Sequence, residues 1–383
     1  MKQPGRTERP PKLLGSLGCR LLAHGNQNVF TGSTPCIVRA LAPSWVLHWL
    51  PRRLRARPSV ALDEPPNRRR RIRVLSTDFH SPSSFPLNSH PALCERRSVK
   101  NPWLERRVLT YAHQGGAKEA PSSTLAAFSR AVAIGCPALE MDVHLTLDGE
   151  LVVSHDETVD RTTSSSGRIS ELTWEQLGEL DNAYWFVPGA DVEQGRTADS
   201  YSCRGLYPGN SAYGFARLED VLKEFPDIFL NLDIKETSPT VVGYERQLAE
   251  VLRAYGRFDD VIVASFHDEA LQRFRHLAPE IHTSLGTNEV LAFGMAFAQR
   301  GPLPKRLEST VAMQVPEMYG DHRIVTASFV ESAHEAGLAI HVWTVDDETD
   351  LHRLLDVGVD GIITDVPSLA LQVVERRQYL FRK

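Results

Sequence analysis

Residues 138–156, ALEMDVHLTLDGELVVSHD, gather acids and a histidine whose types suit proton transfer or cation binding. An alternation of period two places Glu140 and Asp142 on one face of a strand. The Asp-Gly pair at 148–149 predicts a two-residue hairpin turn, which would set Asp142 opposite His155. One hairpin could then present both acids and the histidine together. Paired acids on a strand are also typical of a solvated face, and local spacing does not separate the two interpretations.

The elements that must position these residues begin at Val108, where short apolar strands start to alternate with amphipathic helical stretches. We expect strands over 108–113, 138–146, 151–155, 228–234, 261–266, 282–286, 311–315, 339–345 and 361–364, and helices over 122–135, 217–226 and 326–337. Ser122 or Ser123 is the expected N-cap of the first helix, and Gly135 its stop. About eight βα units remain once one strand is assigned to the hairpin. This count predicts a (β/α)8 TIM barrel, with a doubly wound sheet as the alternative.

Polar side chains recur where these strands end, and in a barrel the chemistry lies at the carboxyl ends of the strands. Two glycines follow the first strand and permit close approach of the backbone to a ligand. Acids, histidines, a lysine and an aromatic side chain therefore converge from separate strands. They are His113, Glu140, Asp142, His155, Asp233, Lys235, His341 and Trp343.

Three carboxylates at one barrel mouth, Glu140, Asp142 and Asp233, would repel one another unless a cation holds them. Oxygen ligands of this kind suit Mg²⁺ or Ca²⁺. A cation beside a lysine and two glycine amides makes a place for phosphate. His113 and His155 suit proton transfer in both directions near neutral pH. These residues by themselves indicate metal-assisted phosphoryl chemistry.

Four ordered blocks resemble the successive motifs of the glycerophosphodiester phosphodiesterases: AHQGGAKEAPSSTLAAF, LEMDVHLTLDGELVVSHDETVDRTT, LNLDIK and VWTVDD…GVDGIITDVP. The resemblance covers roughly 108–383. It implies a (β/α)8 barrel that hydrolyses glycerophosphodiesters to glycerol 3-phosphate and an alcohol with a divalent cation. It also implies attack by the substrate's own glycerol hydroxyl, through a cyclic phosphate that water then opens.

Carried over by position, the resemblance makes His113 and His155 the acid–base pair. The metal ligands it implies are Glu140, Asp142 and Asp233. Lys235 would balance the phosphate charge, Trp343 would wall the glycerol pocket, and Gln114 would contact substrate.

The chain departs from the family pattern at two of these positions. Gln114 stands where an arginine is usual, which replaces a cationic phosphate contact by an uncharged donor. Asp233 stands where a glutamate is usual and is one methylene shorter. Neither change removes a proton carrier or a whole ligand, so we expect activity with altered tuning.

Other roles stay open. Asp156 either orients His155 or serves a turn, and Asp365 is expected as a helix N-cap rather than a ligand. The alternative functions are a lysophospholipase D, which applies the same chemistry to acylated substrates, and a weakly active barrel that binds phosphodiesters. Retention of both histidines argues against the binding barrel, because binding alone needs no pair of proton carriers.

Residues 1–107 differ in composition from the rest. They hold 20 Lys and Arg against 6 Asp and Glu, and 13 of the 24 prolines, whereas the remainder holds 23 basic against 42 acidic residues. We expect a disordered basic extension that is a targeting segment, a tail or upstream sequence from a mis-assigned start. No nucleic acid partner is expected. With no clear secretory signal or membrane span, the expected location is cytoplasmic.

The stretch 181–216 is long, rich in glycine and aromatic residues, and reads as an insertion or lid over the barrel rim. It could cover the alcohol moiety, contact lipid, or simply pack on the rim. This insert and the basic extension are the two candidate places for peripheral membrane contact.

Overall fold

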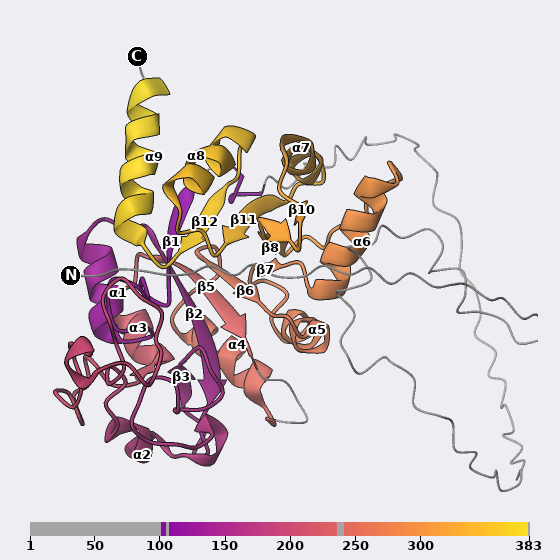
Figure 1. Cartoon of the computed structure of the whole chain (residues 1–383). Coiled ribbons are helices and arrows are strands. Elements are labelled where there is room, and N and C mark those ends of the chain that lie inside the picture. Colours follow the sequence, from indigo (N-terminus) through magenta and orange to yellow (C-terminus); the bar gives the residue numbers. More distant parts are fainter. Residues whose placement is uncertain (1–100, 105–106, 236–240, 382–383) are drawn as a thin grey trace, which may run out of the picture. The chain divides into compact units, whose positions relative to one another are not determined.

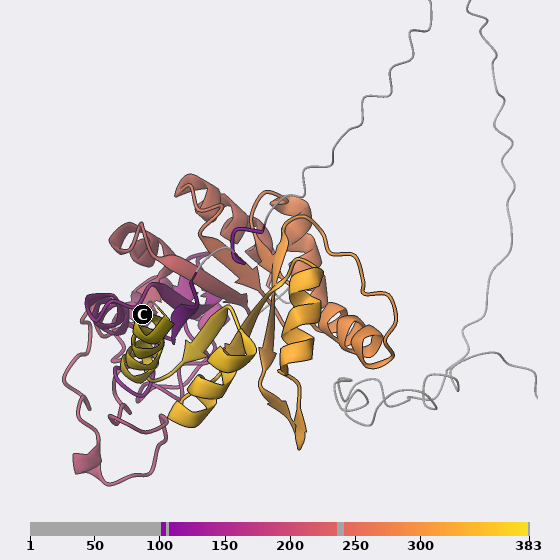
Figure 2. The same ribbon diagram turned by 90° about the horizontal axis from the view of Figure 1, so that it is seen from above.

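The computed structural model describes residues 101–104, 107–235 and 241–381. In this part, parallel strands close into a barrel, because the first strand pairs with both the last and the second. Figure 1 shows the strands inside a layer of helices, and Figure 2 shows the same arrangement from above. The barrel strands are β1 (Leu109–His113), β2 (Ala138–Leu145), β5 (Phe229–Ile234), β6 (Val261–Ala264), β7 (Thr283–Ser284), β8 (Thr310–Pro316), β11 (Ala339–Trp343) and β12 (Gly361–Thr364). The predicted (β/α)8 barrel is confirmed.

The helices pack outside this barrel. They are α1 (Leu125–Ala133), α2 (Trp174–Gly178), α3 (Leu218–Glu224), α4 (Tyr244–Ala254), α5 (Asp268–Leu277), α6 (Thr287–Ala298), α7 (Ala327–Glu335), α8 (Glu348–Val357) and α9 (Pro367–Phe381). Short 3₁₀ turns lie at η3 (Ile169–Glu171) and η4 (Ala198–Ser200). No helix of the described residues is both long and apolar enough to cross a membrane.

Alternation along the strands divides the core. In β2, Leu139, Met141 and Val143 belong to the apolar layer between strands and helices. The intervening Glu140 and Asp142 are buried on the other face and line the cavity described below. The strand is therefore covered on both faces, which excludes the solvated-face interpretation.

The hairpin register differs from the prediction by one residue. Strand β3 (Leu151–Val153) pairs antiparallel with β2 through Val143↔Val153 and Leu145↔Leu151. The turn has three residues, 147–149, closed by a bond from the amide of Thr146 to the carbonyl of Glu150, 2.9 Å long. A three-residue loop that ends in a left-handed glycine is a common hairpin alternative to the two-residue turn. Asp142 therefore faces Ser154 and not His155, which follows the end of β3.

Strand β3 also pairs antiparallel with a two-residue strand, β4 (Ala216–Arg217), which the sequence did not predict. A second small sheet joins β9 (Met318–Tyr319) and β10 (His322–Arg323).

The N-cap of α1 differs from the prediction of Ser122 or Ser123. Thr124 is the cap, and its side chain accepts from the amide of Ala127, whereas Ser123 has a left-handed φ of 60°.

The amino-terminal end of the barrel is closed by residues 101–104. Trp103 is 1% exposed and packs edge-on to Phe229. The side-chain amide of Asn101 donates to the carbonyl of Val311 at 2.6 Å. Part of the segment assigned to the extension thus packs against the barrel, and its other residues, Arg107 apart, lie outside the described residues.

Candidate active site

A cavity of about 200 Å³ opens at the carboxyl ends of the barrel strands. One part of its wall is polar and carries most of the residues predicted from the sequence, and another part is apolar. The predicted residues that line it are His113, Glu140, Asp142, His155, Asp233, Lys235 and Trp343. Asn231, Gln314, Phe266, Leu285 and Val290 also line it and were not predicted.

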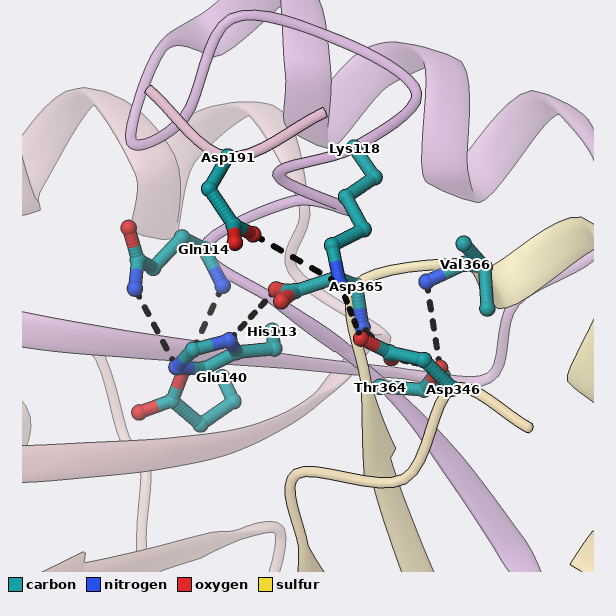
Figure 3. Close-up of polar contacts among 9 residues, drawn as sticks. All are labelled: His113, Gln114, Lys118, Glu140, Asp191, Asp346, Thr364, Asp365 and Val366. Carbon is teal, nitrogen blue, oxygen red and sulfur yellow. Dashed lines mark hydrogen bonds and ion pairs between the residues drawn. The ribbon is translucent and has the colours of Figure 1, made fainter. Parts of the chain in front are cut away.

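His113, the last residue of β1, is fixed from two sides (Figure 3). Its Nδ1 lies 2.6 Å from Asp365 Oδ1. An ionised carboxylate only accepts hydrogen bonds, so Nδ1 carries the proton in this contact. Burial alone would lower the pKa of His113, but the carboxylates of Glu140 and Asp365 outweigh it and raise this pKa to about 9. The prediction of an N-cap missed this role of Asp365.

Gln114 lies behind His113 and is not among the lining residues. It is 4% exposed, and its Nε2 lies 3.1 Å from His113 Nε2. Its Oε1 is buried with no hydrogen-bond partner. The amide can donate to the neutral ring, or exchange its two ends and accept from the imidazolium. The arginine that the family pattern has here could only donate.

His155 reaches the same cavity from the chain after β3, with its ring centroid 6.4 Å from that of His113. Its Nδ1 lies 2.7 Å from Asp156 Oδ1. The other oxygen of Asp156 accepts from Arg161 Nε. Burial opposes ionisation of Asp156, but the bonds from His155 and Arg161 lower its pKa to about 2. Of the two roles considered for Asp156, the structure has the orienting one.

Lys235 stands between two of the carboxylates. Its Nζ lies 2.9 Å from Asp142 Oδ1 and 2.8 Å from Asp233 Oδ2. Burial lowers the pKa of Lys235, but these two acids raise it more strongly. Burial and the neighbouring Asp142 raise the pKa of Glu140 to about 8, and burial raises that of Asp233.

Among the described residues, no group of three or more His, Cys, Asp or Glu side chains is already arranged to hold a metal ion. The donor set is nevertheless that of a hard cation, because all three predicted ligands offer oxygen. Asp142 Oδ2 and Asp233 Oδ1 are buried without a hydrogen-bond partner. These two buried acceptors and the carboxylate of Glu140 fit the oxygen donors that such a cation takes.

The insert 181–216 contributes no residue to the cavity lining. It is tied to the two chain segments that carry the histidines. The amide of Gly189 donates to the carbonyl of Lys118 at 2.7 Å. Trp185 Nε1 donates to the carbonyl of Thr163 at 2.6 Å. Other aromatic side chains of the insert contact one another, as in the stacked pair Tyr207 and Tyr213.

The profile of the glycerophosphoryl diester phosphodiesterase family matches residues 113–369, which is most of the barrel. The chain belongs to this family. A glycerophosphodiester phosphodiesterase of Caldanaerobacter subterraneus is 31% identical over 70% of this chain and 99% of its own length. A human lysophospholipase D is 24% identical over 75% of this chain and 91% of its own length.

Solved structures of the glycerophosphodiester phosphodiesterase family share the fold. A phosphodiesterase of Oleispira antarctica, solved with the product sn-glycerol-3-phosphate, has a TM-score of 0.52 and 23% identity. It aligns with 70% of this chain and 96% of its own. Membership of the family makes this chain a phosphoric diester hydrolase.

Sequence reasoning missed two parts of the site. The apolar wall comes from the segments after β6 and β7. Phe266 ends an expected strand and was considered as a substrate contact without being predicted as one, whereas Leu285 and Val290 gave only an ordinary apolar pattern. Asp365 follows directly on the end of β12, and that position at a strand end was the signal that could have found it.

Proposed function

We propose that the chain hydrolyses glycerophosphodiesters to glycerol 3-phosphate and an alcohol, with His113 and His155 moving the protons. The observation that carries the proposal is the pairing of two histidines in one cavity, each bonded through Nδ1 to an aspartate. Such a bond fixes the ring and leaves Nε2 as the nitrogen that exchanges a proton. Two rings fixed in this way can take up one proton and release another in the same step.

The reaction needs one histidine that accepts a proton and one that donates a proton. A glycerol hydroxyl of the substrate attacks phosphorus, so that a new P–O bond forms while the P–O bond to the alcohol breaks. One histidine takes the hydroxyl proton, and the other gives a proton to the leaving oxygen. Water then opens the cyclic phosphate with the two roles exchanged. This restores both rings and releases glycerol 3-phosphate.

Glu140, Asp142 and Asp233 are the residues that would hold a Mg²⁺ or Ca²⁺ ion. When bound, the ion would neutralise phosphate charge as it develops. Lys235 supplies a second positive charge beside Asp142 and Asp233. Trp343, which contacts Phe266 edge-on with ring centroids 5.7 Å apart, walls the side of the cavity where a glycerol group would lie.

The test is release of glycerol 3-phosphate from glycerophosphocholine by the full chain, with Mg²⁺, with Ca²⁺ and with EDTA. We expect cation-dependent release that falls at least about 100-fold in His113→Ala and in His155→Ala. His276→Ala, which removes an exposed histidine of α5, is the matched control and should retain full activity. Equal rates in EDTA, or a His113→Ala variant as active as the control, would contradict the assignment.

The apolar part of the wall supports a second candidate, a lysophospholipase D activity on acylated substrates. Phe266 is 52% exposed at the cavity, and Leu285 and Val290 continue the apolar surface onto the start of α6. An acyl chain could lie there without leaving the phosphate position. Lysophosphatidylcholine and glycerophosphocholine should be compared in Val290→Asp, which should lose the acylated substrate selectively if this wall binds the chain.

The expected cytoplasmic location stays a prediction, as does membrane contact through the insert 181–216. Of the basic extension, the structure describes only residues 101–104, which pack at the amino-terminal end of the barrel, and Arg107.

A further inference from the structure

Asp346 is an acid of the loop after β11 that is not among the residues lining the cavity. We propose that Asp346 is a positioning residue for His113, acting through Asp365. The inference rests on the proposed function, because it assigns His113 a proton to carry. It extends that function to a residue that touches neither the substrate position nor the histidine.

Asp346 binds three groups at once (Figure 3). Its Oδ1 accepts from the backbone amide of Asp365 at 2.8 Å and from the hydroxyl of Thr364 at 3.0 Å. Its Oδ2 accepts from Lys118 Nζ at 2.8 Å. All three donors belong to segments that hold the imidazole of His113 in place: the end of β12 and the loop after β1.

The position of Asp365 depends on these bonds. The residue lies between the last residue of β12, Thr364, and the first residue of α9, Pro367, so its amide has no strand or helix partner. Asp346 supplies the missing acceptor. Because the carboxylate of Asp365 lies 2.6 Å from His113 Nδ1, a small shift of its backbone turns the ring. At metal sites, the loss of a supporting hydrogen bond of this kind commonly lowers activity about 10- to 100-fold. We expect a loss of about the same size when Asp346 is removed.

Lys118 links the two segments a second time. Its backbone amide donates to the carbonyl of Asp365 at 3.2 Å. The bond from its ammonium to Asp346 outweighs burial and raises the pKa of Lys118. Asp191 of the insert also lies 3.5 Å from this ammonium, but its side chain is 83% exposed. A pair so open to water contributes little.

The experiment compares kcat and KM for glycerophosphocholine in the full chain and its variants. Asp346→Ala removes all three bonds, whereas Asp346→Asn keeps an oxygen that can accept from Asp365 and Thr364. Asp347→Ala is the matched control, because the neighbouring acid caps α8 through the amides of Thr349 and Asp350. A double variant with Asp365→Asn tests whether Asp346 acts through Asp365.

We expect Asp346→Ala to lower kcat about 10- to 100-fold with KM changed less than about threefold. Asp346→Asn should recover most of kcat, and Asp347→Ala should lower the melting temperature and leave kcat unchanged. In the Asp365→Asn background, Asp346→Ala should have no further effect. An Asp346→Ala variant with wild-type kcat, an Asn variant as poor as the Ala variant, or fully additive effects would overturn the inference.

A measurement independent of turnover separates this inference from the proposed function. NMR of the full chain with ¹⁵N-labelled histidine should show a low-field proton on His113 Nδ1, identified by its loss in His113→Gln. We expect that resonance to shift or vanish in Asp346→Ala and to persist in Asp347→Ala. If it persists unchanged in Asp346→Ala, the positioning role is wrong, whether or not the protein hydrolyses glycerophosphocholine.

Discussion

Lys235 lies between Asp142 and Asp233, two of the three predicted metal ligands. An ammonium and a divalent cation answer the same need, since both neutralise buried carboxylates. Asp142 Oδ2 and Asp233 Oδ1 are buried and accept no hydrogen bond from the lysine or from another side chain. Removal of one member of a buried charge group leaves the others without compensation and costs about 3–5 kcal/mol.

We therefore expect Lys235→Met to lower the free energy of unfolding in EDTA by about 3–5 kcal/mol. Millimolar Mg²⁺ or Ca²⁺ should restore part of the loss, because a cation that binds only the folded carboxylates stabilises the folded state. Urea unfolding with and without the cation measures both effects. Lys223→Met, which removes an exposed lysine paired with Glu219 on α3, is the control. Its free energy of unfolding should stay close to that of the wild type and should not change with the cation. Equal behaviour of the two variants would contradict this account.

At the scale of the elements, two glycines adopt nearly the same backbone conformation in different surroundings. Gly149 ends the hairpin turn with a φ of 87°, and a Cβ there would meet only Gln247 Oε1, at 3.9 Å. Gly115 follows β1 with a φ of 86°, and a Cβ there would lie 2.7 Å from the Cβ of Ala127. Only the second position therefore couples helix packing to the segment that carries His113.

Gly149→Ala should cost about 1–2 kcal/mol of stability, the cost of a left-handed L-residue, and leave kcat unchanged. Gly115→Ala adds a clash with α1, so we expect a loss of about 2–5 kcal/mol. It should also lower kcat about 10- to 100-fold, because the shift moves the chain that carries His113. Thermal unfolding and kinetics of the pair decide the matter. A normal kcat in a folded Gly115→Ala protein would show that the loop absorbs the clash.

The strands could be predicted because their apolar alternation and their polar ends are local features of the chain. All nine expected strands exist, although β7 is only two residues long. The hairpin register could not be predicted, since Asp148-Gly149 fits turns of two or three residues. His155 nevertheless reaches the cavity, because it lies beyond the end of β3 and is not bound by the register.

Site residues at strand ends were found for the same reason, whereas their supports were not. His113 and Asp365 are 252 residues apart, and only closure of the barrel through β1 and β12 brings them together. Asp365 beside a helix start looked like a cap for as long as its distant partner was unknown. Asp346 directly follows the expected strand 339–345 and lies in the VWTVDD block, but its partners Thr364, Asp365 and Lys118 are distant in the sequence and gave it no predicted role.

At the scale of the whole molecule, the barrel has a polar mouth and a closed floor. At the floor, Tyr111 and Trp103 pack around His341, with ring centroids 5.1 and 6.2 Å from that of the histidine. His341 is fully buried and shares a strand face with Trp343, but only Trp343 lines the cavity. The prediction that both residues lie at the mouth was therefore right for Trp343 alone.

This buried imidazole makes the stability of the whole barrel depend on pH. Burial lowers the pKa of His341 from 6.5 to about 3. Below about pH 6.5 the unfolded chain binds a proton at this residue that the folded chain refuses until about pH 3. The free energy of unfolding therefore falls with acidification, by up to about 1.4 kcal/mol per pH unit from this group.

His341→Leu removes that proton uptake, so between pH 7 and pH 5 the variant should lose about 2 kcal/mol less stability than the wild type. Urea unfolding at several pH values in this range gives the two slopes. His276→Leu, which removes an exposed histidine from α5, is the control and should follow the wild-type slope. Parallel curves for all three proteins would mean that the floor admits the proton, and that acid acts on the barrel through the carboxylates and histidines of its mouth instead.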